Sequence, residues 1–263
     1  YRVDFDTLEN LAELHNGEIG AICCSRPTNP TGNVLTDDEM ARLEAIAKRF
    51  DIPLIIDNAY GMPFPNIIYS QATLNWNEQI ILCFSLSKIG LPGVRTGIVV
   101  ANPQVVKAIS SLNAIVNLAP TRFGAAIATP LLQDDRLKDL SDNHIRPFYQ
   151  GQAKLAVQLL KQELGNLPND AMKIHKPEGA IFLWVWFKDL PITTVELYER
   201  LKAKGTLIIP SEHFFVGVDT ENFKHAHECI RLSIAQDDDT LKKGIATIGE
   251  VVREVYKVQN RFN

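Results

Sequence analysis

Residues 19–57 read IGAICCSRPTNPTGNVLTDDEMARLEAIAKRFDIPLIID, and this stretch decides the fold class. It begins with the apolar run Ile19–Ser25 and ends with a second one, Pro53–Asp57. Between them, Thr36 and Glu39 have the spacing of a capping box, and apolar residues follow at helical spacing. Short apolar runs separated by a helix are typical of neighbouring parallel strands. The stretch therefore predicts a strand, a helix and a strand of an α/β layer.

The rest of the chain extends this pattern and then changes it. The apolar runs Gln79–Ser85 and Gly97–Ala101 predict two more strands, so we expect residues 1–142 to form a mostly parallel sheet with helices on both faces. Residues 143–263 predict a smaller α+β domain. Its expected elements are the aromatic strand Ile181–Phe187, the helix Thr194–Lys204, the strands Leu207–Ile209 and Cys229–Ala235, and the helix Thr240–Tyr256.

Three helices are expected between the two regions, at Pro103–Val116, Arg122–Leu132 and Leu137–Leu164. The last is long enough to run from one domain into the other. It contains Pro147, which has no backbone N–H to donate, so a break or kink is expected near residues 144–146.

Composition excludes several classes of partner. The 263 residues carry 27 Lys+Arg and 31 Asp+Glu, a formal net charge of −4, and the pI is about 5.9. This balance gives no general reason to expect binding to nucleic acid or to an anionic membrane. No apolar run approaches the roughly 20 residues that span a bilayer, so we expect no membrane insertion.

The four cysteines are Cys23, Cys24, Cys83 and Cys229, and none of them has metal-site spacing. The first three lie in runs that are interpreted as buried strands, which favours free, reduced thiols and a cytoplasmic protein. The six histidines are scattered and fit neither a metal site nor a catalytic triad. The chain opens at Tyr1 without Met or a signal-peptide pattern, so it is expected to be a piece of a longer protein.

The segment most informative about function is Ser85–Gly97, SLSKIGLPGVRTG. It starts where a buried strand is expected to end, and in open α/β sheets ligands bind at that end of the strands. Ser85, Ser87 and Arg95 suit a phosphate group, and a partly desolvated Lys88 suits a Schiff base. Glycines among these residues would let the backbone approach a ligand closely.

This segment resembles the lysine motif of the fold-type I aminotransferases that depend on pyridoxal 5'-phosphate. Three other stretches are similar to motifs of the same family and occur in the same order: Asn29–Gly32 (NPTG), Asp57–Tyr60 (DNAY) and Cys229–Ser233 (CIRLS). Together the four stretches span the chain. Residues 175–184 and 187–194, together with the shortened Lys88-Ile89-Gly90 motif, resemble the branch of the family that exchanges amino groups between valine and pyruvate.

The resemblance implies a role for each matched position. Lys88 would be the catalytic lysine and Asp57 the carboxylate that keeps the ring nitrogen of the cofactor protonated. Tyr60 and Asn29 would donate hydrogen bonds to its phenolic oxygen. Ser85, Ser87 and Arg95 would bind its phosphate. The substrate would be bound by Arg231, through its α-carboxylate, with Asn29 and Gly179 beside it.

Each position also has a structural interpretation. Asp57 is a common residue in a turn after a strand, and Asn29 before Pro30 is a common turn dipeptide. The two serines and Arg95 are compatible with a solvated surface. Alternation along an edge strand would place Arg231 in solvent, and Gly179 is compatible with an ordinary turn. Trp184 and Trp186 are expected to belong to the core.

The function implied by the resemblance is transamination between L-valine and pyruvate, giving 3-methyl-2-oxobutanoate and L-alanine, in branched-chain and alanine metabolism. The same residues could instead serve β-elimination from cysteine conjugates, or a pyridoxal-binding module without catalysis. No metal is expected. The family implies a homodimer, and an N-terminal portion of the subunit that contributes to the site and has no counterpart in this chain.

Overall fold

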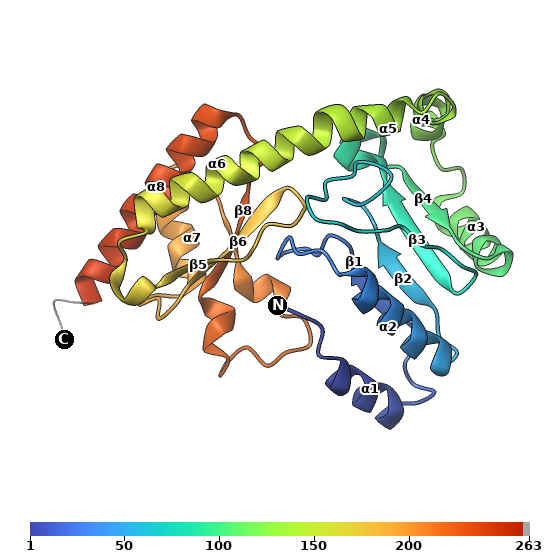
Figure 1. Ribbon diagram of the computed structural model, residues 1–263, viewed down its shortest axis with the longest axis horizontal. Helices are drawn as coiled ribbons and strands as arrows, with labels where there is room; N and C mark the ends of the chain where they lie inside the picture. The colour runs from blue at the N-terminus through green and yellow to red at the C-terminus, as the bar shows by residue number, and fades with distance from the viewer. Residues whose placement is uncertain (260–263) are drawn as a thin grey trace. The chain divides into compact units, whose positions relative to one another are not determined.

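The computed structural model describes residues 1–259 and separates them into two units, which carry one sheet each (Figure 1). Unit 1 comprises residues 1–29, 33–147 and 178–180. Unit 2 comprises residues 30–32 and 148–177 and the chain from residue 181 onward. None of the helices within residues 1–259 is long and apolar enough to cross a membrane.

The sheet of unit 1 has the strand order β1-β2-β3-β4. Its strands are β1 (Ile22–Ser25), β2 (Leu54–Asp57), β3 (Ile80–Ser85) and β4 (Gly97–Val100). The first three are parallel, and β4 is antiparallel to β3. The predicted α/β class with a mostly parallel sheet is confirmed. The last residues of β1, β2 and β3 and the first residue of β4 meet at one edge, which we call the carboxyl edge.

Five α-helices belong to unit 1. The predicted capping box of α2 is present, since Thr36 Oγ1 accepts the Glu39 N–H at 3.1 Å and Glu39 Oε2 accepts the Thr36 N–H at 2.8 Å. Helix α1 was not predicted; it lies beside α2 (Figure 1), and Arg49 of α2 forms an ion pair with Glu13 of α1. The helices are α1 (Phe5–Leu14), α2 (Asp37–Arg49), α3 (Pro103–Asn117), α4 (Phe123–Gln133) and α5 (Arg136–Leu140).

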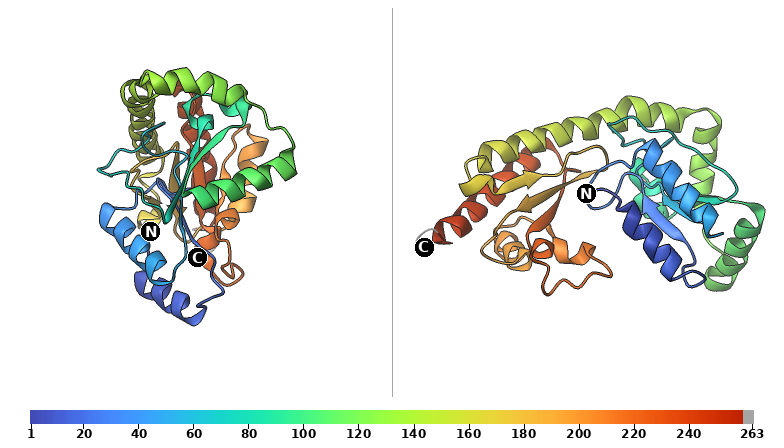
Figure 2. Two further views of the ribbon diagram at one scale, coloured as in Figure 1. Left: turned by 90° about the vertical axis from the view of Figure 1, so that its right-hand side faces the viewer. Right: turned by 60° about the horizontal axis from the view of Figure 1, so that its bottom comes forward.

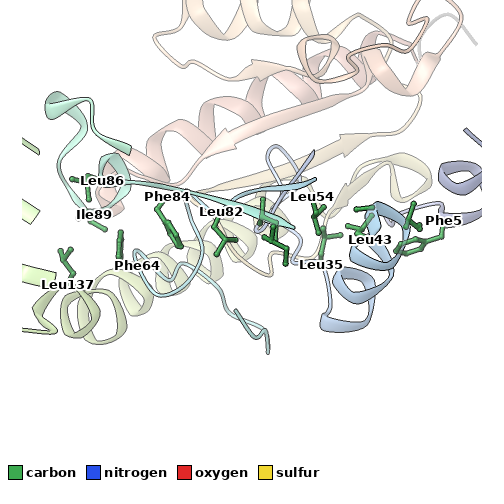
Figure 3. Close-up of a cluster of buried hydrophobic side chains, with 14 of the residues drawn as sticks. Phe5, Leu35, Leu43, Leu54, Phe64, Leu82, Phe84, Leu86, Ile89 and Leu137 are labelled. Atoms are coloured by element: carbon green, nitrogen blue, oxygen red, sulfur yellow. The ribbon is translucent and has the colours of Figure 1, made fainter. Parts of the chain in front are cut away.

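The core of unit 1 lies on one face of this sheet (Figure 3). Alternate residues of β2 and β3 are buried there, together with apolar residues of α2. The rings of Phe64 and Phe84 pack against each other, with their centres 5.7 Å apart. The other face is less covered within the described residues. Cys23 is exposed and Cys24 and Cys83 are half-buried, so the prediction that these cysteines are buried is wrong. Cys23 and Cys83 lie on the face opposite to Leu82 because side chains alternate along a strand.

Pro147 interrupts the long helix as predicted. A π-helical turn, Ser141–Ile145, follows α5, and α6 (Arg146–Leu164) begins directly after it. Proline cannot donate a hydrogen bond to the preceding turn, and a widened turn avoids the clash that its ring would cause in a regular α-helix. The break lies at residues 141–145, next to the expected position.

The sheet of unit 2 has the order β5-β6-β8-β7, with every neighbouring pair antiparallel. Strand β5 (Met172–Ile174) was not predicted, and β7 (Ile209–Pro210) covers only the end of its predicted range. Helix α8 contacts α6, where Arg253 donates to the Glu163 carboxylate at 2.8 Å (Figure 2, right). The other elements are β6 (Phe182–Phe187), α7 (Thr194–Ala203), β8 (Cys229–Ser233) and α8 (Asp238–Gln259).

A buried arginine ties the loop after β1 to α2. The Arg26 side chain is only 8% exposed, and its Nε donates to the Leu35 carbonyl at 2.7 Å. Its two terminal nitrogens donate to the Thr73 carbonyl at 2.8 Å and to Asp37 Oδ1 at 2.7 Å. Three charge-assisted hydrogen bonds thus fix the backbone that leads from β1 into the Asn29 loop.

We expect Asp37 to make the free energy of unfolding depend on pH in the acid range. The hydrogen bond from Arg26, together with hydrogen bonds from Thr73, lowers the pKa of Asp37 from 3.8 to about 2. A carboxyl with a lowered folded-state pKa stabilises the fold above its unfolded-state pKa, and this stabilisation is lost as the pH falls toward the folded-state value. The side chain is 49% exposed, so we expect an effect of about 1 kcal/mol or less.

The variant Asp37→Asn isolates this effect, because its amide oxygen can still accept from Arg26. Between about pH 4 and about pH 2 the wild-type chain should lose more stability than the variant, as measured by urea unfolding at each pH. Parallel curves for the two proteins across this range would contradict the prediction.

Candidate active site

The carboxyl edge of unit 1 gathers the predicted cofactor residues. They follow three consecutive strands or precede the fourth, and parallel strands present their ends on the same side of a sheet. Asn29 follows β1, Asp57 and Tyr60 lie at the end of β2, Ser85, Ser87 and Lys88 lie at the end of β3, and Arg95 precedes β4. Cofactor residues that are as far apart in the sequence as Asn29 and Arg95 therefore lie at the same edge of the sheet.

Lys88 lies on a short 3₁₀ turn, Leu86–Ile89, that begins where β3 ends. Ser85 caps this turn, because its Oγ accepts the Ser87 N–H at 3.2 Å, and Gly90 ends it with a φ of +97° that favours glycine. Lys88 itself is half-buried, with Nζ 5.3 Å from the centre of the Tyr60 ring. The turn thus holds the amine beside the phenol at the carboxyl edge.

Arg95 and Ser87 form a cation–hydroxyl pair next to Lys88. Arg95 Nη1 donates to Ser87 Oγ at 3.5 Å and to the Pro92 carbonyl at 3.3 Å. The backbone of Arg95 has a φ of +46°, which costs energy for a residue with a Cβ. Such strain often occurs at ligand sites, and the exposed guanidinium and hydroxyl here have the chemistry of a phosphate site.

Asp57 is the last residue of β2, in register with Ser25 on one side and Cys83 on the other. Its Oδ1 accepts the Ala59 N–H at 3.0 Å, so the turn geometry anticipated for an aspartate after a strand is present. A buried carboxylate would stabilise a protonated ring nitrogen most strongly, but the Asp57 carboxylate is exposed. Asp57 lies on the less covered face of the sheet, as Cys83 does. The pKa of the Cys83 thiol is raised, first by its partial burial and then by the negative charge of Asp57.

Ser25 also helps to hold the Asn29 loop, a role that was not predicted from the sequence. Its Oγ accepts the Asn29 N–H at 3.2 Å, and its carbonyl accepts the Thr28 hydroxyl at 3.1 Å. The Thr28 N–H donates to the Asn33 carbonyl at 2.8 Å, which closes the loop. The turn predicted from Asn29-Pro30 is thus part of how Asn29 is held at the carboxyl edge. A serine at the last residue of β1, as at the end of β3, was the available signal.

Gly179 belongs to unit 1 and packs against the loop after β1. It forms a bridge with Ile68, and a Cβ at this position would lie 2.6 Å from both the Ile67 carbonyl oxygen and Pro27 Cγ. The preceding residue, Glu178, is buried and accepts the Val34 N–H at 3.1 Å. Close backbone packing therefore requires glycine here, whatever else the position does.

Arg231 belongs to unit 2 and is not part of the carboxyl edge of unit 1. It lies on β8, half-buried, and pairs in register with Trp184 on β6 and Ile209 on β7. Strand β8 therefore has a neighbour on each side, so the interpretation of Arg231 as a residue of an edge strand is wrong. Trp184 is buried, as expected of a core residue, and Trp186 is half-buried.

The polar side chains at the carboxyl edge have the chemistry needed to bind pyridoxal 5'-phosphate. A phosphate needs hydroxyls and a cation, a pyridine nitrogen needs an acidic partner, and an aldehyde needs an amine. Ser85, Ser87 and Arg95 supply the first set, Asp57 the second and Lys88 the third. The space around Gly90 and Gly93 is open, with no atom within 4 Å of a Cβ at either position. Within residues 1–259, no cluster of His, Cys, Asp and Glu is arranged to hold a metal ion.

Comparisons with known proteins point the same way. The family model described as "Aminotransferase class I and II" matches residues 1–248. Among curated proteins, the valine–pyruvate aminotransferase of Escherichia coli (strain K12) is 46% identical over 257 residues, which are 97% of this chain and 59% of that protein.

Two crystal structures resemble the chain over 98% of its length. One, assigned to an amino-acid aminotransferase of Psychrobacter arcticum 273-4, has 73% sequence identity and a TM-score of 0.94, and 58% of that chain is covered. The other, valine–pyruvate aminotransferase AvtA of Salmonella typhimurium LT2, has 45% identity and a TM-score of 0.88, and 64% of it is covered. The chain thus spans less than two thirds of the length of these relatives.

Proposed function

The chain belongs to the class I and II aminotransferases, a family that depends on pyridoxal phosphate, and we propose that it acts in transamination between L-valine and pyruvate. The products are 3-methyl-2-oxobutanoate and L-alanine. The observation that carries the reaction class is the convergence of Lys88, Asp57 and Arg95 at one edge of the sheet. The choice of substrates is supported by the 46% identity to the valine–pyruvate aminotransferase of E. coli.

The cofactor site in this proposal is the carboxyl edge. Ser85, Ser87 and Arg95 bind the phosphate, and the Asp57 carboxylate stabilises the protonated ring nitrogen. Tyr60 and Asn29 donate hydrogen bonds to the phenolic oxygen. Pyridoxal phosphate, when bound, supplies an electron sink for the electrons left on the substrate α-carbon.

Lys88 has two tasks in the proposed reaction. Its Nζ would hold the cofactor covalently when no substrate is bound. The freed Nζ then accepts the proton from the substrate α-carbon and later delivers it, as general base and general acid. The 3₁₀ turn that ends at Gly90 supports both tasks, because it fixes the backbone of Lys88 at the end of β3.

Substrate binding is assigned to Arg231 of unit 2 and to Asn29 and Gly179 of unit 1. The planar guanidinium of Arg231 binds the α-carboxylate through two parallel hydrogen bonds, a geometry that lysine cannot reproduce. Valine and alanine differ by two methyl groups, each worth about 0.8 kcal/mol when buried, so one small apolar pocket can accept both. A homodimer and a cytoplasmic location complete the proposal, the latter supported by the free thiols of all four cysteines.

The test is a profile of amino donors for the protein loaded with pyridoxal phosphate. With pyruvate as acceptor, valine should give a kcat/KM at least about tenfold higher than aspartate, glutamate or phenylalanine, because a small apolar pocket excludes charge and bulk. Alanine should be formed in equal amount to 3-methyl-2-oxobutanoate. Preference for acidic or aromatic donors would overturn the choice of substrate. Release of pyruvate and ammonia from a cysteine conjugate, in preference to transamination, would overturn the reaction class.

A further inference from the structure

The guanidinium of Arg231 lies close to two aromatic rings in unit 2. Its Cζ is 5.0 Å from the centre of the Phe182 ring and 4.9 Å from the centre of the Phe214 ring. Both distances fall within the roughly 6 Å over which a cation is attracted to an aromatic ring. Phe182 comes from β6, the strand next to β8 in the sheet, as Figure 1 shows. Phe214 comes from a different element, a 3₁₀ turn at Ser211–Phe214.

Such packing limits the freedom of an otherwise flexible side chain. An arginine side chain has many rotamers, and this freedom is lost when the side chain must bind a ligand in one orientation. Aromatic contacts that fix the guanidinium beforehand reduce this loss at the moment of binding. A half-buried Arg231 held in this way is a preorganised site for a carboxylate.

Phe214 is itself fixed by the sheet. Trp184 pairs in register with Arg231, so both side chains lie on the same face of the sheet. The Trp184 ring meets Phe214 edge to face, with the ring centres 5.6 Å apart and an angle of 88°. Phe214 therefore has a buried tryptophan to fix its orientation and a cation to contact.

The turn that carries Phe214 is tied down by polar contacts at its start. Ser211 is fully buried; its Oγ donates to the Ala226 carbonyl and accepts the Cys229 N–H at 3.1 Å. Glu212 accepts from the Thr194 hydroxyl at 3.0 Å and bonds to His227 Nδ1 at 2.9 Å. These contacts join the turn to α7 and to the chain that enters β8, the strand of Arg231.

We propose that Phe214 is a positioning residue that holds the guanidinium of Arg231 in the orientation needed to bind the substrate carboxylate. This inference rests on the proposed role of Arg231. It predicts that loss of the Phe214 ring weakens the binding of carboxylates while the later chemistry, which takes place at Lys88, is unchanged. In kinetic terms KM rises and kcat does not fall, as when binding common to the ground state and the transition state is lost.

Four variants of the protein loaded with pyridoxal phosphate test this role. Phe214→Leu removes the aromatic ring, and Phe214→Tyr keeps it. Arg231→Lys keeps the positive charge but removes the planar guanidinium. Phe223→Leu is the matched control, because this ring belongs to the same aromatic group and packs on the Phe215 and His225 rings, with ring centres 5.4 Å and 5.8 Å apart. We expect Phe214→Leu to raise KM for valine and pyruvate about threefold to tenfold, with kcat within about twofold. Phe214→Tyr and Phe223→Leu should match the wild-type protein.

Direct binding gives a second readout that does not depend on turnover. The probes are 3-methylbutanoate and its uncharged amide, measured by calorimetry. Phe214→Leu should weaken binding of the acid by about the same threefold to tenfold factor and leave binding of the amide unchanged. Equal weakening of acid and amide would indicate general damage and overturn the inference.

Arg231→Lys separates the two proposals. If this variant loses affinity for the acid and Phe214→Leu does not, the role of Phe214 is wrong and that of Arg231 stands. If Arg231→Lys binds the acid as tightly as the wild-type protein, Arg231 does not bind the carboxylate, and the role of Phe214 falls with it.

Discussion

Lys88→Ala should lower kcat for transamination at least about 10³-fold, because in the proposed mechanism this one side chain would both hold the cofactor and move the substrate proton. Steady-state formation of alanine from valine and pyruvate measures this loss. Reduction with borohydride gives an independent readout: it should fix the cofactor to the peptide that contains Lys88 in the wild-type protein and leave the variant unlabelled.

The matched control is Lys107→Ala, which removes an exposed lysine from α3 in the same unit. It should retain the wild-type rate and the labelling of Lys88. Full turnover by Lys88→Ala would contradict the proposed mechanism, and labelling at a different lysine would show that the cofactor site lies elsewhere.

Arg26→Met should lower the free energy of unfolding by roughly 3 kcal/mol, because it removes three charge-assisted hydrogen bonds from a buried position. The methionine fills a similar space but leaves the carbonyls of Leu35 and Thr73 without this donor. At roughly 2–4 °C per kcal/mol, the melting temperature should fall by roughly 6–12 °C. Circular dichroism during heating measures the change.

Arg49→Met provides the comparison, because it breaks ion pairs at the surface between α1 and α2, where the Arg49 side chain is 56% exposed. Exposed pairs contribute about 0–1 kcal/mol, so this variant should melt within a few degrees of the wild-type protein. Equal effects of the two substitutions would show that the buried hydrogen bonds of Arg26 add nothing to stability.

Arg26 illustrates why part of the site could not be predicted from the sequence. Its position before Pro27 predicts only a turn after a strand. Its burial depends on three partners that lie up to 47 residues away, at Leu35, Asp37 and Thr73. Local pattern contains no information about which distant carbonyls will meet a guanidinium, so the role of Arg26 emerges only from the folded chain.

Local sequence patterns predicted the helices and strands better than they predicted which of these elements pack against one another. The capping box of Thr36 and Glu39 was found as expected, because both groups belong to one turn of the chain. The short strand β5 was missed, since its three residues carry too little pattern. The burial of Cys23 and Cys83 was wrong for a related reason: an apolar strand shows that its residues can be buried, and only the packing of other elements decides whether both faces are.

The sequence by itself determined the α/β class and the order of the motifs, and it supplied the residues that are proposed to bind the cofactor, because periodicity and residue type are local properties. Only the tertiary structure decided that Asp57, Lys88 and Arg95 meet at one edge, since the parallel pairing of β2 with β3 and the antiparallel pairing of β3 with β4 join separate segments of the chain. It also decided that the guanidinium of Arg231 contacts both the Phe182 ring and the Phe214 ring. Those contacts depend on the register of β6 and β8 and on a turn that neither strand specifies.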